Sequence, residues 1–305
     1  MDDLFRVLLL QGGYNTTVVM LGAAALGIAA GAVGVFAMLR RRALVSDAVA
    51  HATLPGVAGA FILAAAVGLP GRSPLILMAG AAVTAFVSLV AVQVLARQPR
   101  VTEDTATAAV LASAFGLGVA LLSIVQSLST GGQAGLDAYL FGGTAGMLER
   151  EAYLMGALAL AVLLVILLLF KELSSAAFDP SFAVASGLPL ARLDAVVALL
   201  SLATVVVGLR VVGLVLIVAL LIIPPAAARF WSDCIGIVVA VSSLIGAASA
   251  YLGAAISAVA PDVPTGATIV VVCAGLFAIS LAFGSARGLV IRAIGAARPS
   301  VAAAP

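Results

Sequence analysis

The chain is dominated by apolar runs that approach 20 residues, the length at which an α-helix crosses the hydrocarbon core of a bilayer. Hydrophobic residues make up 64% of the 305 residues and charged residues only 9%, whereas an ordinary soluble domain is about 25% charged. So few charges could not cover the surface of a soluble fold. This excludes a soluble enzyme, a nucleic-acid-binding protein and a disordered chain, and predicts an all-α polytopic membrane protein.

Nine apolar segments are candidate membrane spans. One region, 194–229, is ambiguous, because Gly208, Arg210 and Gly213 could mark a turn between two spans or a break within one long helix. We therefore expect eight or nine transmembrane helices. The candidates lie near residues 16–39, 48–69, 74–96, 105–128, 152–170, 194–209, 212–229, 235–258 and 267–285.

The basic residues predict the orientation of these spans. If nine spans alternate, eleven basic residues fall on one side, including Arg40 to Arg42, and four on the other. The richer side is expected to be cytoplasmic, which places the N-terminus outside and the C-terminal tail inside. The N-terminus opens with Asp2 and Asp3 rather than a basic region, so we expect the first span to remain in the mature chain.

Two segments outside the spans complete the predicted organisation. Residues 1–294 are expected to form one transmembrane domain, and residues 295–305 a disordered cytoplasmic tail. Within the domain, residues 172–193 form a cytoplasmic segment of mixed polarity. Asp179–Pro180 is a helix start signal and Gly187–Pro189 a stop signal, so a short helix is predicted between them. Such a helix could dock a soluble partner, or the segment could be a plain solvated connector.

Ionisable residues at membrane depth are costly and are therefore candidates for function. Asp47 and His51, the only histidine, are the candidates, because the other acidic residues fall in predicted loops or at span ends. A spacing of four places both side chains on one helix face, where they can converge on one ion. Pro55 continues this face, and its missing N–H leaves the carbonyl of His51 without its usual helical donor.

A structural interpretation of this pair is also open. Ser46 could cap the helix, Asp47 could favour the helix dipole in the first turn, and His51 could be a hydrogen-bonded core residue. The functional interpretation needs more ligands than one chain offers. A two-fold dimer would bring two Asp and two His together, and these donors suit manganese, iron(II) or zinc rather than copper(I).

The lysine content shows whether the chain could hydrolyse ATP by itself. Lys171 is the only lysine, and no G-x-x-x-x-G-K-[ST] motif is present. The chain therefore cannot supply a P-loop, and ATP-driven activity would require another polypeptide.

Four ordered blocks resemble the permease subunits of the ABC-3 family of bacterial metal-importing ABC transporters. The first, SDAVAHATLPG, is similar to the family pattern G-D-A-[LI]-S-H-A-V-L-P-G, with Ser46 in place of Gly and Ala50 in place of Ser. The third contains Pro224–Pro225, where the family usually has one proline. The blocks are Ser46 to Gly56, Leu169 to Pro189, Val205 to Arg229 and Pro261 to Ile269.

The resemblance implies a homodimeric permease in the bacterial inner membrane, with a cytoplasmic ATPase subunit and an extracytoplasmic metal-binding protein as partners. It implies that Asp47 and His51 transiently coordinate the transported metal, that no cofactor is permanently bound, and that nucleic acid is not a partner. Residues 135–142 resemble the manganese and iron branch more than the zinc branch. The remaining residues to which it assigns a role are Pro55, Pro224 and Pro225, for gating or helix breaks, and Asp179, Pro180, Ala185, Ser186 and Gly187, for ATPase coupling.

Two other functions are alternatives for a membrane protein of this kind. A stand-alone secondary transporter, driven by protons or sodium, would require further intramembrane acids or broken-helix cation sites. A membrane metalloprotease would require H-E-x-x-H or an equivalent ligand cluster, which a chain with one histidine does not supply.

Overall fold

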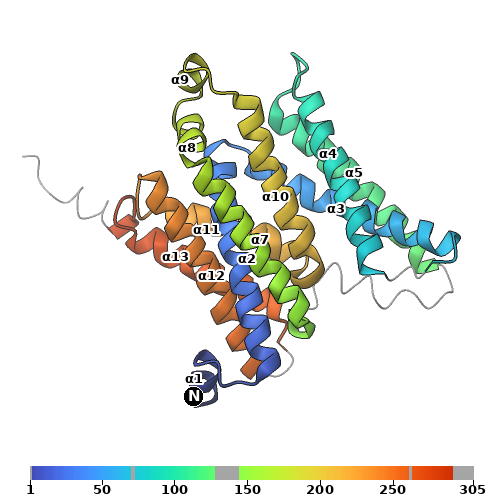
Figure 1. The fold of residues 1–305 in the computed structure, drawn as a ribbon, viewed down its shortest axis with the longest axis vertical. Helices are drawn as coiled ribbons and strands as arrows, with labels where there is room; N and C mark the ends of the chain where they lie inside the picture. The colour runs from blue at the N-terminus through green and yellow to red at the C-terminus, as the bar shows by residue number, and fades with distance from the viewer. Residues whose placement is uncertain (1, 70–72, 128–143, 261–262, 291–305) are drawn as a thin grey trace, which may run out of the picture.

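The computed structural model describes residues 2–69, 73–127, 144–260 and 263–290, which fold into helices and connecting turns (Figure 1). Eight of the described helices are long and apolar enough to cross a membrane. This confirms the predicted all-α polytopic fold. The eight are α2 (Tyr14–Leu39), α3 (Ala43–Ala66), α4 (Pro74–Leu95), α5 (Glu103–Ser127), α7 (Glu149–Leu168), α10 (Leu190–Val212), α12 (Ile235–Val259) and α13 (Thr265–Phe283).

The ambiguous region contains two helices joined by a sharp turn. Gly213 has φ 80° and separates α10 from α11 (Leu214–Ala228). A Cβ on Gly208 would lie 2.8 Å from Cδ1 of Ile217, so the two helices fold back on each other. The 15 residues of α11 extend only about 22 Å, less than the roughly 30 Å of a hydrocarbon core. The described chain thus has eight full-length helices and one short apolar helix.

Two short helices follow α7 at one end of the molecule. These are α8 (Phe170–Phe178) and α9 (Pro180–Ala185). In Figure 1 they lie at the same end as the turn between α4 and α5, and the N-terminal helix α1 (Asp2–Leu8) lies at the opposite end. The end that carries α8 and α9 also carries Arg40 to Arg42, in agreement with the side on which the sequence predicted the arginines to gather.

The helix α2 is the centre of the bundle, since 72% of its apolar stretch is buried. It packs closely against α12 through small residues. A Cβ on Gly31 would lie 2.6 Å from the carbonyl oxygen of Ser242, whose hydroxyl donates a 2.7 Å hydrogen bond to the carbonyl of Gly31. Small residues and hydroxyl groups of this kind allow membrane helices to approach closely.

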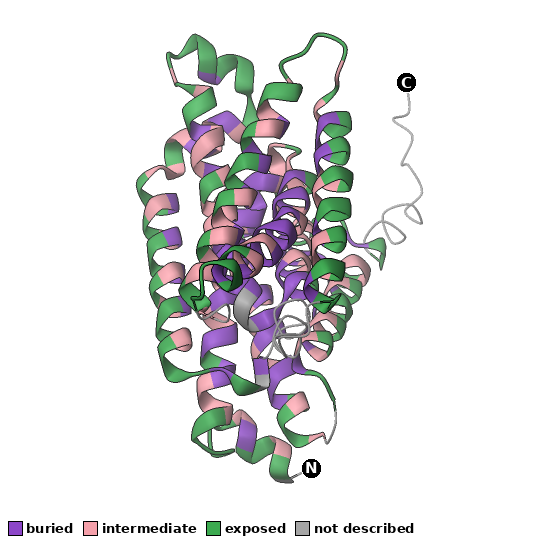
Figure 2. Ribbon diagram, turned by 90° about the vertical axis from the view of Figure 1, so that its right-hand side faces the viewer, coloured by how far each residue is buried: buried purple, intermediate pink, exposed green. Residues whose placement is uncertain are grey.

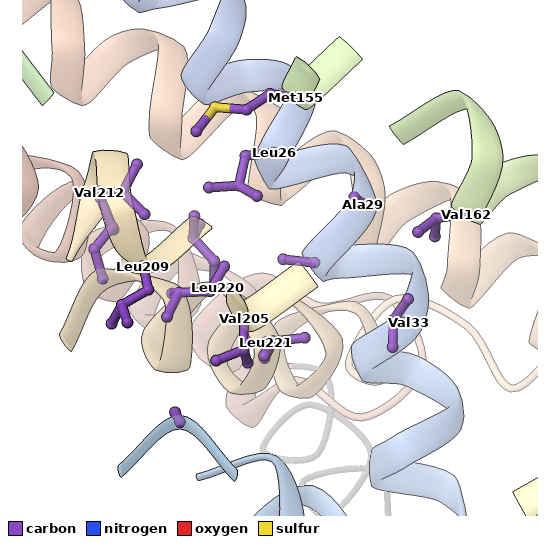
Figure 3. Packing of buried hydrophobic residues seen from close by; sticks show 14 of the residues in the cluster. Leu26, Ala29, Val33, Met155, Val162, Val205, Leu209, Val212, Leu220 and Leu221 are labelled. Carbon is purple, nitrogen blue, oxygen red and sulfur yellow. The ribbon is translucent and has the colours of Figure 1, made fainter. Parts of the chain in front are cut away.

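The largest hydrophobic cluster surrounds α2. In Figure 3, Leu26 and Val33 of α2 lie among residues from α7, α10 and α11, such as Met155 and Leu209. The outer helices are much less buried, with only 17% of the apolar stretch of α13 and 22% of that of α5 covered (Figure 2). Their exposed apolar side chains form the surface expected to meet lipid or another subunit.

Candidate functional site

Asp47 and His51 lie one turn apart on α3, which begins at Ala43. The expectation that Ser46 caps this helix is wrong, because Arg42 holds the capping position and Ser46 is buried inside the helix. At 1.5 Å per residue, the two side chains leave the helix about 6 and 12 Å from its start. The pair therefore lies within the first nine of the 24 residues of α3, toward the arginine-rich end of the molecule.

The two side chains converge. Nε2 of His51 lies 3.4 Å from Oδ1 of Asp47, and the side chains are 25% and 26% exposed. Nδ1 of His51 is buried and has no hydrogen-bond partner in the described structure. A carboxylate and an imidazole that meet at the surface of one helix, each still partly open, can bind a cation from the same side.

Phe115 of α5 forms one wall beside the histidine. The two rings pack edge to face, with centroids 5.3 Å apart and planes at 90°. This neighbour of His51 was not predicted. A phenylalanine in an apolar helix carries no signal of its own, and the contact depends on how α3 and α5 pack.

Pro55 lies inside α3, which continues through it as a helix. It packs against α5 at Gly118, where an added Cβ would lie 3.1 Å from Cδ of Pro55 and 2.7 Å from Cβ of Leu54. This close contact with α5 fixes the orientation of α3. It therefore also fixes the position of His51, which lies on the same helix face one turn before Pro55.

Pro224 and Pro225 are buried in α11, which also continues through them. A Cβ on Gly34 of α2 would lie 2.7 Å from Cγ of Pro225. The structure thus places this proline against the central helix. A gating role for the three prolines stays a prediction.

One copy of the chain supplies an incomplete metal site. Among the described residues, no group of three or more His, Cys, Asp or Glu side chains could hold a metal ion. Asp47 and His51 are two donors, so further ligands must come from another molecule, from backbone carbonyls or from water.

The predicted start and stop of the short helix α9 are both present. Oδ1 of Asp179 accepts hydrogen bonds from the amides of Ser181 and Phe182, at 2.9 and 3.0 Å, and Pro180 follows as the first helical residue. The helix ends at Ala185. The ATPase-coupling role assigned to this segment stays a prediction.

The end of α9 has the geometry of a glycine stop. Ser186 caps the helix, and Gly187 has φ 79°, a left-handed conformation that glycine adopts readily. The amide of Leu188 then donates a 3.0 Å hydrogen bond to the carbonyl of Ala183. Local hydrogen bonds therefore define both ends of α9.

Three large apolar side chains project from this region. Phe178 is 87% exposed, Phe182 62% and Val184 58%. The residues predicted to contact a partner include the small residues Ala185 to Gly187 and not these three. The sequence does carry a signal for these three residues, because apolar residues in a short segment outside the spans are candidates for contact with a partner.

Comparison with known proteins gives a family match over most of the chain. The family described as "ABC 3 transport family" matches residues 14–284. The manganese transport system membrane protein MntC of Bacillus subtilis is 33% identical over 280 residues. That alignment covers 92% of this chain and 63% of the relative, so the chain spans less than two thirds of its length. The zinc transport system membrane protein TroC of Treponema pallidum is 36% identical, with 90% of this chain and 91% of the relative covered.

Solved structures share the fold. PsaBC from Streptococcus pneumoniae in complex with Fab has a TM-score of 0.77 at 29% identity, covering 91% of this chain and 95% of that one. An inward-facing conformation of a putative metal-chelate type ABC transporter has a TM-score of 0.66 at 18% identity, which shows likeness of fold alone.

Proposed function

Because the chain belongs to the ABC 3 transport family, we propose that it is the membrane-spanning subunit of an ATP-driven importer that moves a divalent transition metal into the cell. It is a multi-pass protein of the bacterial inner membrane and a transporter subunit rather than an enzyme. The observation that carries the proposal is the convergence of Asp47 and His51, 3.4 Å apart and partly exposed on one helix face.

In this proposal, the metal is a substrate that the pair holds transiently. Each protomer contributes one carboxylate and one imidazole, and two copies related by a two-fold axis provide four donors and two negative charges. Phe115 of α5 limits the space on one side of the imidazole. The ion also has to leave the site again. Two weak sites of two donors each, which meet at the two-fold axis, release the ion more readily than one closed site of four ligands would.

The permease works with other polypeptides. A cytoplasmic ATPase hydrolyses ATP, since the chain has a single lysine and no P-loop, and an extracytoplasmic binding protein delivers the metal. The ATPase docks on α8 and α9, where Phe178, Phe182 and Val184 are exposed. The family match favours this arrangement over a secondary transporter that works alone.

The metal is manganese or iron in our proposal, with zinc as the alternative. The names of the relatives mention manganese and zinc. Residues 135–142, on which the preference for the manganese and iron branch rests, lie outside the described residues. The oxygen and imidazole donors of the pair are compatible with all three ions.

The test is cellular metal content, measured by elemental mass spectrometry. The chain is expressed with its ATPase and binding protein in a strain that lacks its own importers. Manganese or iron should accumulate with the wild type, and Asp47→Ala and His51→Ala should reduce accumulation at least about tenfold, since each removes half of a protomer's donors. Asp104→Ala, which removes an exposed carboxylate near the start of α5, is the matched control.

Each outcome decides a different part of the proposal. Wild-type accumulation in both ligand variants would reject the assignment of the pair. Accumulation of zinc alone would keep the mechanism and change the metal. Accumulation with an ATPase subunit that cannot hydrolyse ATP would favour the secondary transporter.

A further inference from the structure

A cavity of about 310 Å³ lies at the arginine-rich end of the molecule, between α3, α4 and α10. Val45, Ser46 and Val49 of α3 line it. These residues occupy a different face of α3 from Asp47 and His51, so the cavity is separate from the candidate metal site. Neither the proposed transport of metal nor the docking of the ATPase uses it.

The charged residues that line the cavity lie at or near the ends of helices. Arg40, Arg42 and Arg97 line it together with Glu103 and Asp194, which leaves an excess of one positive charge. Asp194 is held by both Nε and Nη2 of Arg40, at 2.8 and 3.0 Å, and also lies 3.2 Å from Nη1 of Arg42. The donors of Arg40 are therefore satisfied within the protein.

Arg42 is also paired, because its Nε lies 2.8 Å from Oε1 of Glu103 and its Nη1 lies 3.2 Å from Oδ2 of Asp194. Its Nε is buried, so a ligand in the cavity cannot reach this atom. Arg97, at the end of α4, is exposed and forms no ion pair with any described residue. An exposed, unpaired guanidinium at a cavity with an excess of one positive charge favours a bound anion, and a phosphate group can accept two hydrogen bonds from it.

The deeper part of the cavity is apolar. Val49, Leu89, Val92 and Val197 are buried and line it, and Ser46 and Ser201 are its buried polar residues. Its volume corresponds to about ten groups of the size of a water molecule, at ~30 Å³ each. A free inorganic anion would leave the apolar walls without a partner.

We propose that this cavity binds the phosphate headgroup of an anionic phospholipid of the cytoplasmic leaflet. Arg97 holds the phosphate at the mouth, and the first part of the lipid's apolar chain lies against Val49 and Leu89. The arginine-rich end is the one expected to face the cytoplasm, where anionic lipids and basic pockets between membrane helices meet. Val94 and Leu95, at the end of α4 beside Arg97, are 52% and 38% exposed, so bilayer lipid can reach the mouth.

The test is native mass spectrometry of the chain purified with its ATPase subunit in a neutral detergent. Phosphatidylglycerol and phosphatidylcholine are added in equal amounts, and bound lipid is counted after the micelle is removed. Phosphatidylglycerol should remain bound in preference to phosphatidylcholine. Arg97→Gln should weaken its retention roughly tenfold, because a charge-assisted contact to phosphate is lost.

Two further variants test the charge and the volume of the cavity separately. Arg100→Gln removes the same charge three residues later, from an exposed residue that does not line the cavity, and should retain the lipid as the wild type does. Ala198→Leu fills part of the cavity without changing its charge and should also lower retention.

Several results would overturn the proposal. One is equal retention of the two lipids, and another is equal loss in Arg97→Gln and Arg100→Gln. A third arm uses millimolar inorganic phosphate as the probe. If phosphate binds and phosphatidylglycerol does not, the cavity is a site for a small soluble anion instead.

Discussion

Arg40, at the end of α2, and Asp194, near the start of α10, form a two-point ion pair across 154 residues of sequence, with contacts of 2.8 and 3.0 Å. Nη1 of the same arginine donates a 2.9 Å hydrogen bond to the carbonyl of Ala176 in α8. One guanidinium therefore joins the central helix, α10 and the helix that leads into α9. If α8 and α9 have the proposed coupling role, their movement would reach α2 and α10 through Arg40.

Breaking this pair should destabilise the protein. The two side chains are only 14% and 12% exposed, so Arg40→Gln should lower the free energy of unfolding by about 3 kcal/mol, because a charge is left incompletely paired. Arg287→Gln is the matched control, since its pair with Asp233 is 46% and 64% exposed and should contribute less than about 1 kcal/mol. Thermal unfolding in detergent measures both. Equal shifts in the two variants would contradict the prediction.

The contact between Gly118 and Pro55 gives a second prediction. Gly118→Ala places a methyl group 2.7 Å from Cβ of Leu54, so α5 has to move away from α3, and Phe115 moves with it. We expect a loss of about 1–3 kcal/mol in stability from overpacking and reduced metal uptake. Gly116→Ala is the control, because a Cβ there has no atom within 4 Å, and it should leave uptake and the unfolding temperature unchanged. Identical behaviour of the two variants would show that the helix contact does not matter.

The elements that the sequence predicted correctly depend on local information. The lengths of the apolar runs predicted the spans to within about five residues. The sequence left open whether the region of Gly208, Arg210 and Gly213 is a turn or a break, and the structure has a turn at Gly213, whose φ of 80° suits glycine. The Asp179–Pro180 start and the Gly187 stop of α9 are likewise encoded within a few residues of the helix ends. Residues 295–305 lie outside the described structure, so their predicted disorder stays a prediction.

The features that the sequence did not reveal depend on packing between distant segments. Nothing near Arg40 indicates that its partner is Asp194, and nothing in α5 indicates that Phe115 lies against His51. The helix α8 (Phe170–Phe178) was not predicted, because it lies between the span expected at 152–170 and the short helix expected after Asp179–Pro180. The start of α3 at Ala43, rather than at Ser46, depends on the tight turn after α2, in which Arg41 has φ 58°.

The exposed side chain of Phe182 gives a third prediction. If the ATPase binds α9, Phe182→Ala should weaken co-purification of the ATPase roughly tenfold or more, because an aromatic side chain buried at an interface commonly contributes 2 kcal/mol or more. Phe283→Ala removes the same side chain from an exposed position at the end of α13 (63% exposed). This control should retain the ATPase. Retention in both variants would place the docking surface elsewhere.

The N-terminal cap of α9 gives a last prediction. It distinguishes the stability of the helix from the contact that its exposed side chains make with the ATPase. Oδ1 of Asp179 accepts from two backbone amides, those of Ser181 and Phe182. Asp179→Ala removes both bonds and should destabilise the helix start by about 1 kcal/mol. Hydrogen exchange of these amides, measured by mass spectrometry of the peptide that contains them, should become several-fold faster.

Asp179→Asn is the matched variant, because asparagine keeps the accepting oxygen and caps helices about as well as aspartate. It should exchange at nearly the wild-type rate and retain the ATPase, whereas Asp179→Ala should bind it more weakly, since Phe182 then leaves its fixed position. Fast exchange in both variants would mean that the negative charge, rather than the hydrogen bonds, stabilises α9 through the helix dipole. Fast exchange in Asp179→Ala with undiminished ATPase binding would mean that the partner itself orders α9 on docking, and that the free helix is not a preformed contact.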